Sequence, residues 1–358
     1  MKISVIFTGG TIGSSVGESG YIAPDPACRY QLLDWYYASH RRDMEEYGID
    51  FRISEPYRIL SENLAPKYLN LLIRTVREVL REAEIDGVII THGTDTLQYT
   101  AAALGYVFGN MGVPIVLVSS DYPIQYEKAN GRDNFAAAVR LICERYESGV
   151  VVSYRNRGED VTFHRGTRLL PHENYSADLK SLGNSYLGRL QDGKFIRNTS
   201  DLHRKKDDIR QEMCYNTIDE ITGIDPFFCE KDGRILWIHP YVGMRYPDLP
   251  DSCSAILLNT YHSGTLAVNE QLKRFVKAAA ERKIPAFLYG LPGEEHTYET
   301  VAAYETAGIH VLKPISGIAA YCKLCLASAV SEKTVQVMDT CIAADSLRQE
   351  MLRTTDFQ

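Results

Sequence analysis

The sequence predicts an α/β protein of two domains: a larger N-terminal domain with a doubly wound, mainly parallel sheet, and a smaller C-terminal α/β domain. Three observations predict this fold: the length of 358 residues, short apolar runs without alternation, and amphipathic stretches between those runs. A chain of this length usually holds about two domains. Apolar residues make up 45% and charged residues 24% of the chain, an ordinary composition for a globular protein.

The N-terminal part carries four short runs rich in Val and Ile, at residues 3–7, 87–90, 114–118 and 149–152. Their lack of alternation is typical of strands that are buried on both faces of a parallel sheet. A helix is expected to begin at Pro66, a residue that suits the first helical position. Apolar side chains then recur at helical spacing as far as Leu80.

A second alternating unit occupies the C-terminal part. Strands are expected at 235–239, 255–258, 285–289 and 310–312, and helices at 266–282, 297–307 and 316–330. Residues 191–232, between the two units, are polar and charged and show no sustained apolar period. The expected organisation is therefore an N-terminal domain at 1–190, a charged linker at 191–232 and a C-terminal domain at 233–358.

Charge, hydropathy and cysteine usage exclude several functional classes. The net charge of -7, without a basic face, argues against a nucleic-acid partner. The chain has no signal segment and no apolar run of about 18 residues, so we expect no membrane partner and a cytoplasmic protein with reduced thiols. The pair Cys322 and Cys325 is expected in a helix as buried thiols. The dispersed histidines predict no metal site.

The first motif that carries chemistry is Thr8-Gly9-Gly10-Thr11-Ile12-Gly13, directly after the first strand. A glycine pair there lets the backbone turn sharply and approach a ligand. Ligands bind at this end of the strands in open α/β sheets. The spacing fits neither the dinucleotide nor the P-loop pattern of phosphate binding. The motif alone leaves a plain tight turn and a nucleophilic Thr11 as alternatives.

The second motif is Thr91-His92-Gly93-Thr94-Asp95-Thr96, directly after another buried strand. Hydroxyls that flank a carboxylate could position a water molecule, move a proton or hold an ammonium group. The structural alternative is that these residues cap the next helix, because Thr and Asp are good caps. Thr96 suits that role, whereas His92 is expected to be structural.

The TGGTIG motif, Ser61-Glu62-Asn63 and the ITHGTDT motif of residues 90–96, in this order and spacing, resemble the bacterial type I and II L-asparaginases. The resemblance is strongest in residues 1–135 and extends to residues 261–265. It implies hydrolysis of the side-chain amide of L-asparagine, or of a closely related small amide, to the carboxylate and ammonia. The reaction would pass through an acyl-threonine intermediate without a cofactor. The resemblance also implies a homodimer or a dimer of dimers.

Site residues follow from the resemblance position by position. Thr11 matches the nucleophile, and Tyr21 matches a tyrosine that donates a hydrogen bond to it. Thr94 and Asp95 match a second active threonine and the acid that holds the substrate ammonium. The implied catalytic residues are Thr11, Tyr21, Thr94 and Asp95. The implied substrate-binding residues are Gly10, Ser61, Glu62 and Gly93, and acids of a neighbouring subunit, such as Glu294 and Glu295, are weaker candidates.

The sequence departs from the family at the lysine that usually ends its proton relay. Anchoring on Gly166 places Pro171 there, and counting back from Lys180 places Leu170 there. The segments at 119–123 and 128–131 differ as well. Three alternatives stay open: another cation replaces the lysine, the protein acts on a different amide, or it is catalytically weak or inactive and binds an amino acid. The candidate cations are Lys128, His164, Arg165, Arg168 and Lys180.

A further alternative is the asparaginase-like subunit of a tRNA-dependent amidotransferase. We disfavour it because the chain begins at the first strand and because its negative charge does not suit RNA.

Overall fold

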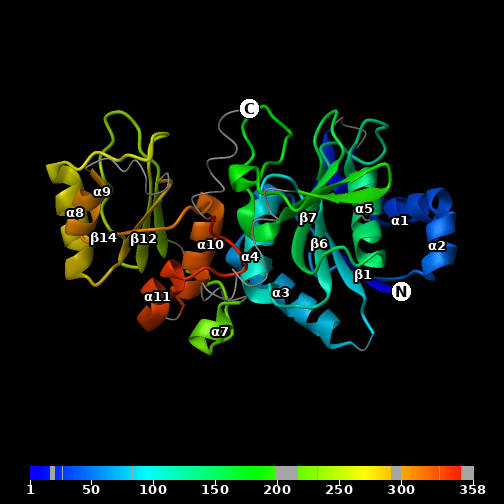
Figure 1. Cartoon of the computed structure of the whole chain (residues 1–358), viewed down its shortest axis with the longest axis horizontal. Coiled ribbons are helices and arrows are strands. Elements are labelled where there is room, and N and C mark those ends of the chain that lie inside the picture. Colours follow the sequence, from blue (N-terminus) through cyan, green and yellow to red (C-terminus); the bar gives the residue numbers. More distant parts are fainter. Residues whose placement is uncertain are drawn as a thin grey trace. The chain divides into compact units, whose positions relative to one another are not determined.

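The structure is a computed structural model that describes residues 1–16, 21–25, 27–82, 84–198, 217–231, 233–291, 300–329 and 331–347 (Figure 1). The chain divides into two compact units. One comprises residues 1–181 and 186–203, and the other comprises residues 182–185 and 204–358. Both units are α/β, and the larger sheet belongs to the N-terminal unit, which confirms the predicted fold class. Residues 199–216 of the expected linker lie outside the described residues.

The N-terminal unit is built on an eight-stranded sheet of order β10-β9-β8-β7-β6-β5-β1-β4. Its strands are β1 (Lys2–Phe7), β4 (Asp50–Ser54), β5 (Gly87–Thr91), β6 (Pro114–Val118), β7 (Gly149–Arg155), β8 (Val161–Arg165), β9 (Gly188–Gln191) and β10 (Lys194–Arg197). The five strands from β4 to β7 pair in parallel, so their carboxyl ends meet at one edge. Strands β8 to β10 continue the sheet in antiparallel fashion.

The hairpin β9–β10 corrects the expected start of the linker at residue 191. Its side chains are mostly half-buried or exposed, as suits the edge of a sheet, and this polar character made the segment resemble a linker. Asp192 and Gly193 form its turn with φ of 48° and 72°. Asp-Gly is a strong signal for such a two-residue turn because both positions need positive φ.

Helices cover both faces of this sheet. In Figure 1, α3 (Pro66–Arg81) and α4 (Leu97–Phe108) lie on one face, and α1 (Ala27–Ser39) and α5 (Gly131–Cys143) lie on the other. Every residue of α4 except Tyr99 is buried, as expected for a helix enclosed on all sides. The short elements of this unit are η1 (Thr11–Gly13), β2 (Ser14–Val16), β3 (Ile22–Pro24), α2 (Arg41–Tyr47), η2 (Ser61–Asn63) and η3 (Gly166–Arg168), whereas η4 (Leu182–Asn184) belongs to the other unit.

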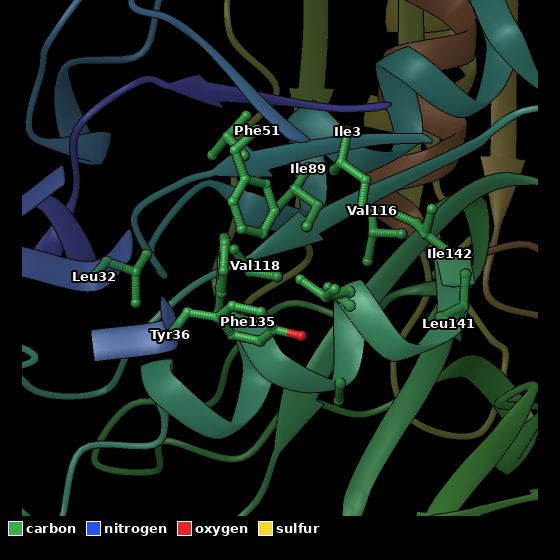
Figure 2. Packing of buried hydrophobic residues seen from close by; sticks show 14 of the residues in the cluster. Ile3, Leu32, Tyr36, Phe51, Ile89, Val116, Val118, Phe135, Leu141 and Ile142 are labelled. Carbon is green, nitrogen blue, oxygen red and sulfur yellow. The ribbon is translucent and has the colours of Figure 1, made fainter. Parts of the chain in front are cut away.

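The core on the α1 and α5 face forms because alternate strand residues point to the same side. Ile3 of β1, Ile89 of β5 and Val116 of β6 pack against Phe135 of α5 and Tyr36 of α1 (Figure 2). All five side chains are at most 1% exposed. The packed layer holds the strands in fixed positions and thereby fixes the loops that follow them.

The C-terminal unit contains a parallel sheet of order β11-β12-β13-β14. Its strands are β11 (Ile235–Ile238), β12 (Ala255–Asn259), β13 (Ala286–Tyr289) and β14 (Ile309–Val311), close to the four expected positions. Its described helices are α7 (Asp219–Thr222), α8 (Glu270–Glu281), α9 (Thr300–Thr306), α10 (Gly317–Ala327), η7 (Ser331–Lys333) and α11 (Thr334–Asp339). None of the described helices has the length and apolar character to span a bilayer.

Helix α10 carries a buried ion pair. Lys323 Nζ lies 2.8 Å from Asp345 Oδ2, and both side chains are at most 2% exposed. Lys323 also donates to the carbonyl oxygen of Thr340, so it holds the segment that follows α11. The same helix carries Cys322 and Cys325, and burial raises the pKa of both thiols, that of Cys325 to about 12. Both lie in a helix as the sequence predicts, and Cys322 is buried whereas Cys325 is half-buried.

Candidate active site

Three segments of the N-terminal unit converge at the carboxyl ends of β1 and β5. The first is the glycine loop of residues 8–13 after β1, and the second is the polar loop of residues 91–96 after β5. The third is the segment of residues 59–63, which pairs with the glycine loop through a bridge between Gly9 and Ile59. Parallel β1 and β5 are neighbours in the sheet, so the two motifs necessarily meet.

The two motifs touch backbone to backbone at Gly10 and Gly93. A Cβ added to Gly10 would lie 2.2 Å from the Gly93 nitrogen, and one added to Gly93 would lie 2.4 Å from Ser61 Oγ. Gly10 also has a φ of 76°, which L side chains rarely adopt. Only glycine permits this approach, which brings the three segments together at one point.

Hydrogen bonds hold the loops in register. The Thr8 hydroxyl donates to the carbonyl oxygen of Thr91 at 2.6 Å. The amide of Gly10 donates to the Ile59 carbonyl at 3.0 Å, and the amide of His92 donates to the Val118 carbonyl at 2.9 Å. These bonds tie the ends of β1, β5 and β6 to each other, so the site has a rigid backbone.

Thr11 and Thr94 each follow one of the two touching glycines. Both residues are half-buried, and neither hydroxyl makes a hydrogen bond to any part of the chain that the structure describes. Thr96 differs, because its hydroxyl donates to the Ser61 carbonyl at 2.8 Å and joins two segments. The geometry therefore leaves Thr11 and Thr94 available to a ligand and gives Thr96 a structural bond.

Acidic side chains border the same point. Asp95 is exposed, and its Oδ2 accepts a hydrogen bond from the buried Ser61 hydroxyl at 3.0 Å. Glu62 follows Ser61 in η2 and is exposed as well. Two carboxylates beside a cluster of hydroxyls are suited to hold the ammonium group of an amino acid.

His92 is part of the loop's framework. Its Nδ1 lies 2.8 Å from the Gly93 carbonyl oxygen, and its Nε2 lies 2.8 Å from the Thr100 hydroxyl. Burial lowers the pKa of His92 to about 4, so the ring is neutral at pH 7. Because both ring nitrogens are engaged, His92 has the structural place that the sequence predicts.

Within the described ranges, no lysine, arginine or histidine forms an ion pair with Asp95, so none of the five candidate cations does. Lys180 pairs with Glu173 at 3.1 Å, and Lys128 lies over the Tyr122 ring. His164 is buried and lies 2.8 Å from the Ser181 hydroxyl. Arg168 is fully buried and Arg165 is half-buried.

The residue that the sequence reasoning missed is His172. Its Nδ1 lies 3.0 Å from the Asp178 carbonyl oxygen, which must accept, so the proton resides on Nδ1. Its Nε2 is buried and has no hydrogen-bond partner among the described residues. Burial lowers the pKa of His172, and the negative charge of Asp95 acts in the opposite direction. The signal in the sequence for this residue was its position: a histidine directly follows Pro171, one of the two expected positions of the lysine.

Tyr21 lies directly before β3, is 78% exposed, and makes no hydrogen bond to Thr11 among the described residues. Its assigned role remains a prediction from the motif. Glu294 and Glu295 lie outside the described residues.

Comparison with known proteins identifies the family. Residues 2–201 match the family model described as "Asparaginase, N-terminal". The chain belongs to the asparaginase family. This asparaginase-family protein is 30% identical over 168 residues to L-asparaginase 1 of Escherichia coli, a match that covers 47% of this chain and 46% of that one. It is 34% identical over 169 residues to a glutamyl-tRNA(Gln) amidotransferase subunit of Methanosarcina mazei, covering 47% of this chain and 38% of that one.

The matched regions thus span less than half the length of these two relatives. Solved structures resemble the protein over almost its whole length. The L-asparaginase of Thermococcus kodakarensis has a TM-score of 0.74 at 23% identity and covers 97% of this chain and 100% of that one. L-asparaginase I of Vibrio cholerae has a TM-score of 0.74 at 22% identity, with 97% and 99% coverage. Because the sequence identities are 23% and 22%, the likeness to these two structures shows a shared fold.

Proposed function

We propose that this asparaginase-family protein hydrolyses the side-chain amide of L-asparagine, or of a closely related small amide, to the carboxylate and ammonia. The observation that carries the proposal is the backbone contact between Gly10 and Gly93. It brings Thr11 and Thr94, with hydroxyls that no described group occupies, to the same point beside Asp95. The likeness to proteins named L-asparaginase supports the choice of substrate.

In this proposal the Thr11 hydroxyl oxygen adds to the amide carbon while its proton passes to a base. The carbon–nitrogen bond then breaks, and the nitrogen leaves as ammonia after it takes up a proton. Water adds to the resulting ester and releases the acid, which restores the Thr11 hydroxyl. Asp95 and Glu62 hold the substrate ammonium, and Ser61 contributes to binding its carboxylate.

His172 is the proton acceptor in this proposal. Its tautomer leaves a lone pair on Nε2, and its lowered pKa keeps the ring neutral and able to accept a proton at pH 7. Asp95 would stabilise the imidazolium that forms. General bases typically contribute about 10²–10⁴-fold to the rate, which makes this role measurable.

Ammonia release by the purified protein tests the function, with L-asparagine, L-glutamine and other small amides as substrates. Thr11→Val removes the hydroxyl at nearly constant volume and should lower kcat by at least about 10³-fold, because the acyl intermediate can no longer form. Thr306→Val, on the exposed side of α9, is the matched control and should leave kcat unchanged. Aspartate-induced stabilisation of a protein that hydrolyses none of these amides would instead indicate an amino-acid-binding protein.

We also propose that the protein forms a homodimer or a dimer of dimers, which is the assembly that the family resemblance implies. We further propose that it is located in the cytoplasm. Light scattering coupled to gel filtration measures the mass of the particle directly. A monomer at micromolar concentration would contradict the proposed assembly.

A further inference from the structure

A cavity opens at the carboxyl ends of β6 and β7, beside the segments that form the candidate active site. Its volume is about 110 Å³. Tyr122 and Lys128 come from the segment after β6, and Arg155 and Arg157 come from the end of β7 and the loop behind it. The cavity therefore lies at the same edge of the sheet as Thr11 and Asp95, and nothing in the proposed amide chemistry uses it.

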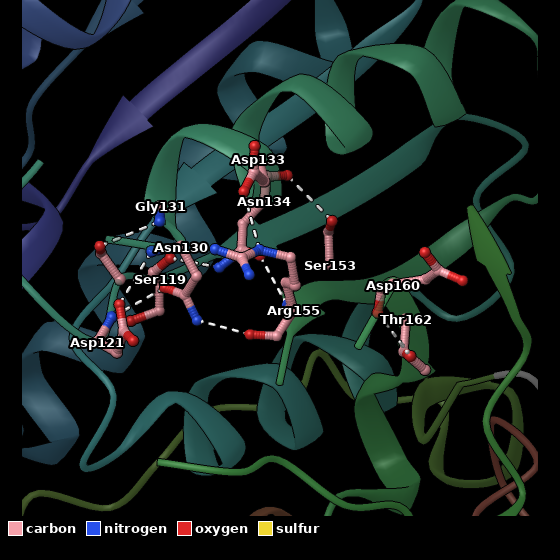
Figure 3. Close-up of polar contacts among 11 residues, drawn as sticks. Ser119, Asp121, Asn130, Gly131, Asp133, Asn134, Ser153, Arg155, Asp160 and Thr162 are labelled. Atoms are coloured by element: carbon pink, nitrogen blue, oxygen red, sulfur yellow. Dashed lines mark hydrogen bonds and ion pairs between the residues drawn. The ribbon is translucent and has the colours of Figure 1, made fainter. Parts of the chain in front are cut away.

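Hydrogen bonds of the buried residue Asn130 hold the walls of this cavity in place (Figure 3). Asn130 is 3% exposed and exchanges two hydrogen bonds of 2.9 Å with Asp121. The Asn130 side-chain amide also donates to the Arg155 carbonyl oxygen at 2.8 Å. These bonds connect the segment after β6 to the end of β7, so the cavity is a fixed part of the fold.

The cavity carries an excess of positive charge. Arg155 is neutralised by Asp133, with Nε and Oδ2 2.8 Å apart. Lys128 Nζ lies 3.8 Å from the centre of the Tyr122 ring. Neither Lys128 nor Arg157 forms an ion pair with any residue that the structure describes. The Asp121 carboxylate also lines the cavity, where it accepts a hydrogen bond from the Asn130 amide. Lys128 and Arg157 together exceed its single negative charge, and a bound anion would balance the excess.

One loop connects the cavity to the candidate active site. Ala177 lines the cavity, and its carbonyl oxygen accepts a hydrogen bond of 2.9 Å from the Tyr154 hydroxyl. The Tyr154 ring lies 6.0 Å from the ring of His172, on whose pKa the charge of Asp95 acts. In the sheet order, β7 is two strands from β5. At about 4.8 Å per strand, the ends of β5 and β7 are roughly 10 Å apart.

We propose that this cavity is a subsite for a second anionic group of the amide substrate, a carboxylate or a phosphate, which Lys128 and Arg157 bind. The inference rests on the proposed function and narrows its substrate class to amides with an additional oxyanion roughly 10 Å from the reacting carbon. The volume of about 110 Å³ suits one such group. A complete small-molecule site usually needs about 300 Å³ or more, so a separate ligand is disfavoured.

Kinetics with matched substrates test the subsite. The dipeptide asparaginyl-aspartate is compared with asparaginyl-alanine, and asparaginyl-phosphoserine with asparaginyl-serine, to distinguish a carboxylate from a phosphate. We expect kcat/KM to be at least about 10-fold higher for one acidic member, since a charge-assisted hydrogen bond contributes about that factor. The double variant Lys128→Gln/Arg157→Gln should abolish this preference. Lys194→Gln, an exposed lysine on β10, is the control and should retain it.

A binding measurement separates this inference from the proposed function. Thr11→Val protein is titrated calorimetrically with inorganic phosphate and with succinate, with and without the Lys128→Gln/Arg157→Gln substitutions. If the protein binds phosphate or succinate and this affinity is lost when both cations are substituted, the result supports the subsite. Equal kcat/KM for acidic and neutral dipeptides overturns it, even if asparagine is hydrolysed. If no amide is hydrolysed, the proposed function fails, and cation-dependent anion binding would then contradict the assignment of the cavity to a substrate.

Discussion

The hydroxyl of Ser61 donates a 3.0 Å hydrogen bond to Asp95 across a gap of 34 residues in the sequence. This bond joins the segment after β4 to the loop after β5 and orients the carboxylate next to Thr94. Ser61 is buried whereas Asp95 is exposed, so the bond anchors a solvent-facing charge to a fixed part of the fold.

Ser61→Ala should weaken substrate binding more than it slows the chemical step. A hydrogen bond to a charged group contributes up to about 1.5–3 kcal/mol, and solvent exposure of Asp95 reduces this value, so KM should rise by about 3- to 10-fold. Steady-state kinetics with the preferred amide measures the effect. Asn63→Ala, in the same turn, should leave KM unchanged, and a similar rise in both variants would contradict a specific role for Ser61.

Gly10→Ala should disrupt the contact between the two motifs. The new methyl group would lie 2.2 Å from the Gly93 nitrogen at a φ of 76°. Left-handed strain of about 1–2 kcal/mol and overpacking of about 1–3 kcal/mol should add, and activity should be lost. Urea unfolding and turnover measure both effects. Gly13→Ala is the matched control, because a methyl group there meets nothing within 4 Å.

His172→Asn tests the proton acceptor. The Asn amide can still donate to the Asp178 carbonyl, but the lone pair of Nε2 is gone. We expect kcat to fall by about 10²–10⁴-fold. Because the pKa of His172 is lowered from 6.5, the parent should lose activity only below that pH, and the variant should lack this acidic limb. An unchanged pH profile would exclude His172 as the base.

Buried histidines should make the protein sensitive to acid. Burial lowers the pKa of His92 to about 4 and that of His164 to about 3, and it also lowers that of His172. Below pH 6.5 the unfolded chain binds protons that the folded chain excludes. The free energy of unfolding should therefore be constant above that pH and fall towards pH 4, by up to about 1.4 kcal/mol per pH unit for each histidine.

Urea denaturation between pH 4.5 and pH 7.5 checks this slope. His164→Gln removes one of the three groups and should make the loss of stability visibly shallower. His262→Gln, at an exposed position, should leave the slope as it is. A parent slope that does not differ from that of His164→Gln would show that this histidine titrates alike in both states.

The sequence predicted the fold well where burial dominates. Strands β1, β5 and β6 are apolar throughout because both of their faces are covered, and the helix that begins at Pro66 has a clear apolar side. Strands at the edge of the sheet were harder to recognise. Residues 188–197 lie at the edge of the sheet, where β10 pairs on one side only, and they carry several polar side chains, so hydropathy did not separate them from a linker.

The candidate site was predictable to the extent that motifs follow strands. Thr11 and Thr94 follow neighbouring parallel strands, so they were expected to meet. The relation between His172 and Asp95 was not predictable, because 77 residues separate them and the intervening chain crosses three further strands. The two ways of locating the expected lysine position gave Leu170 and Pro171, and His172 follows them directly.

The ion pair between Lys323 and Asp345 restricts how these two positions can diverge. Loss of either partner leaves the other charge uncompensated in apolar surroundings, at a cost of about 3–5 kcal/mol. Replacement of both, as in Lys323→Met with Asp345→Leu, removes the desolvation penalty together with the attraction and should restore most of the stability. Variation at residue 323 is therefore conditional on residue 345, and each intermediate step between the two states passes through a weakened fold.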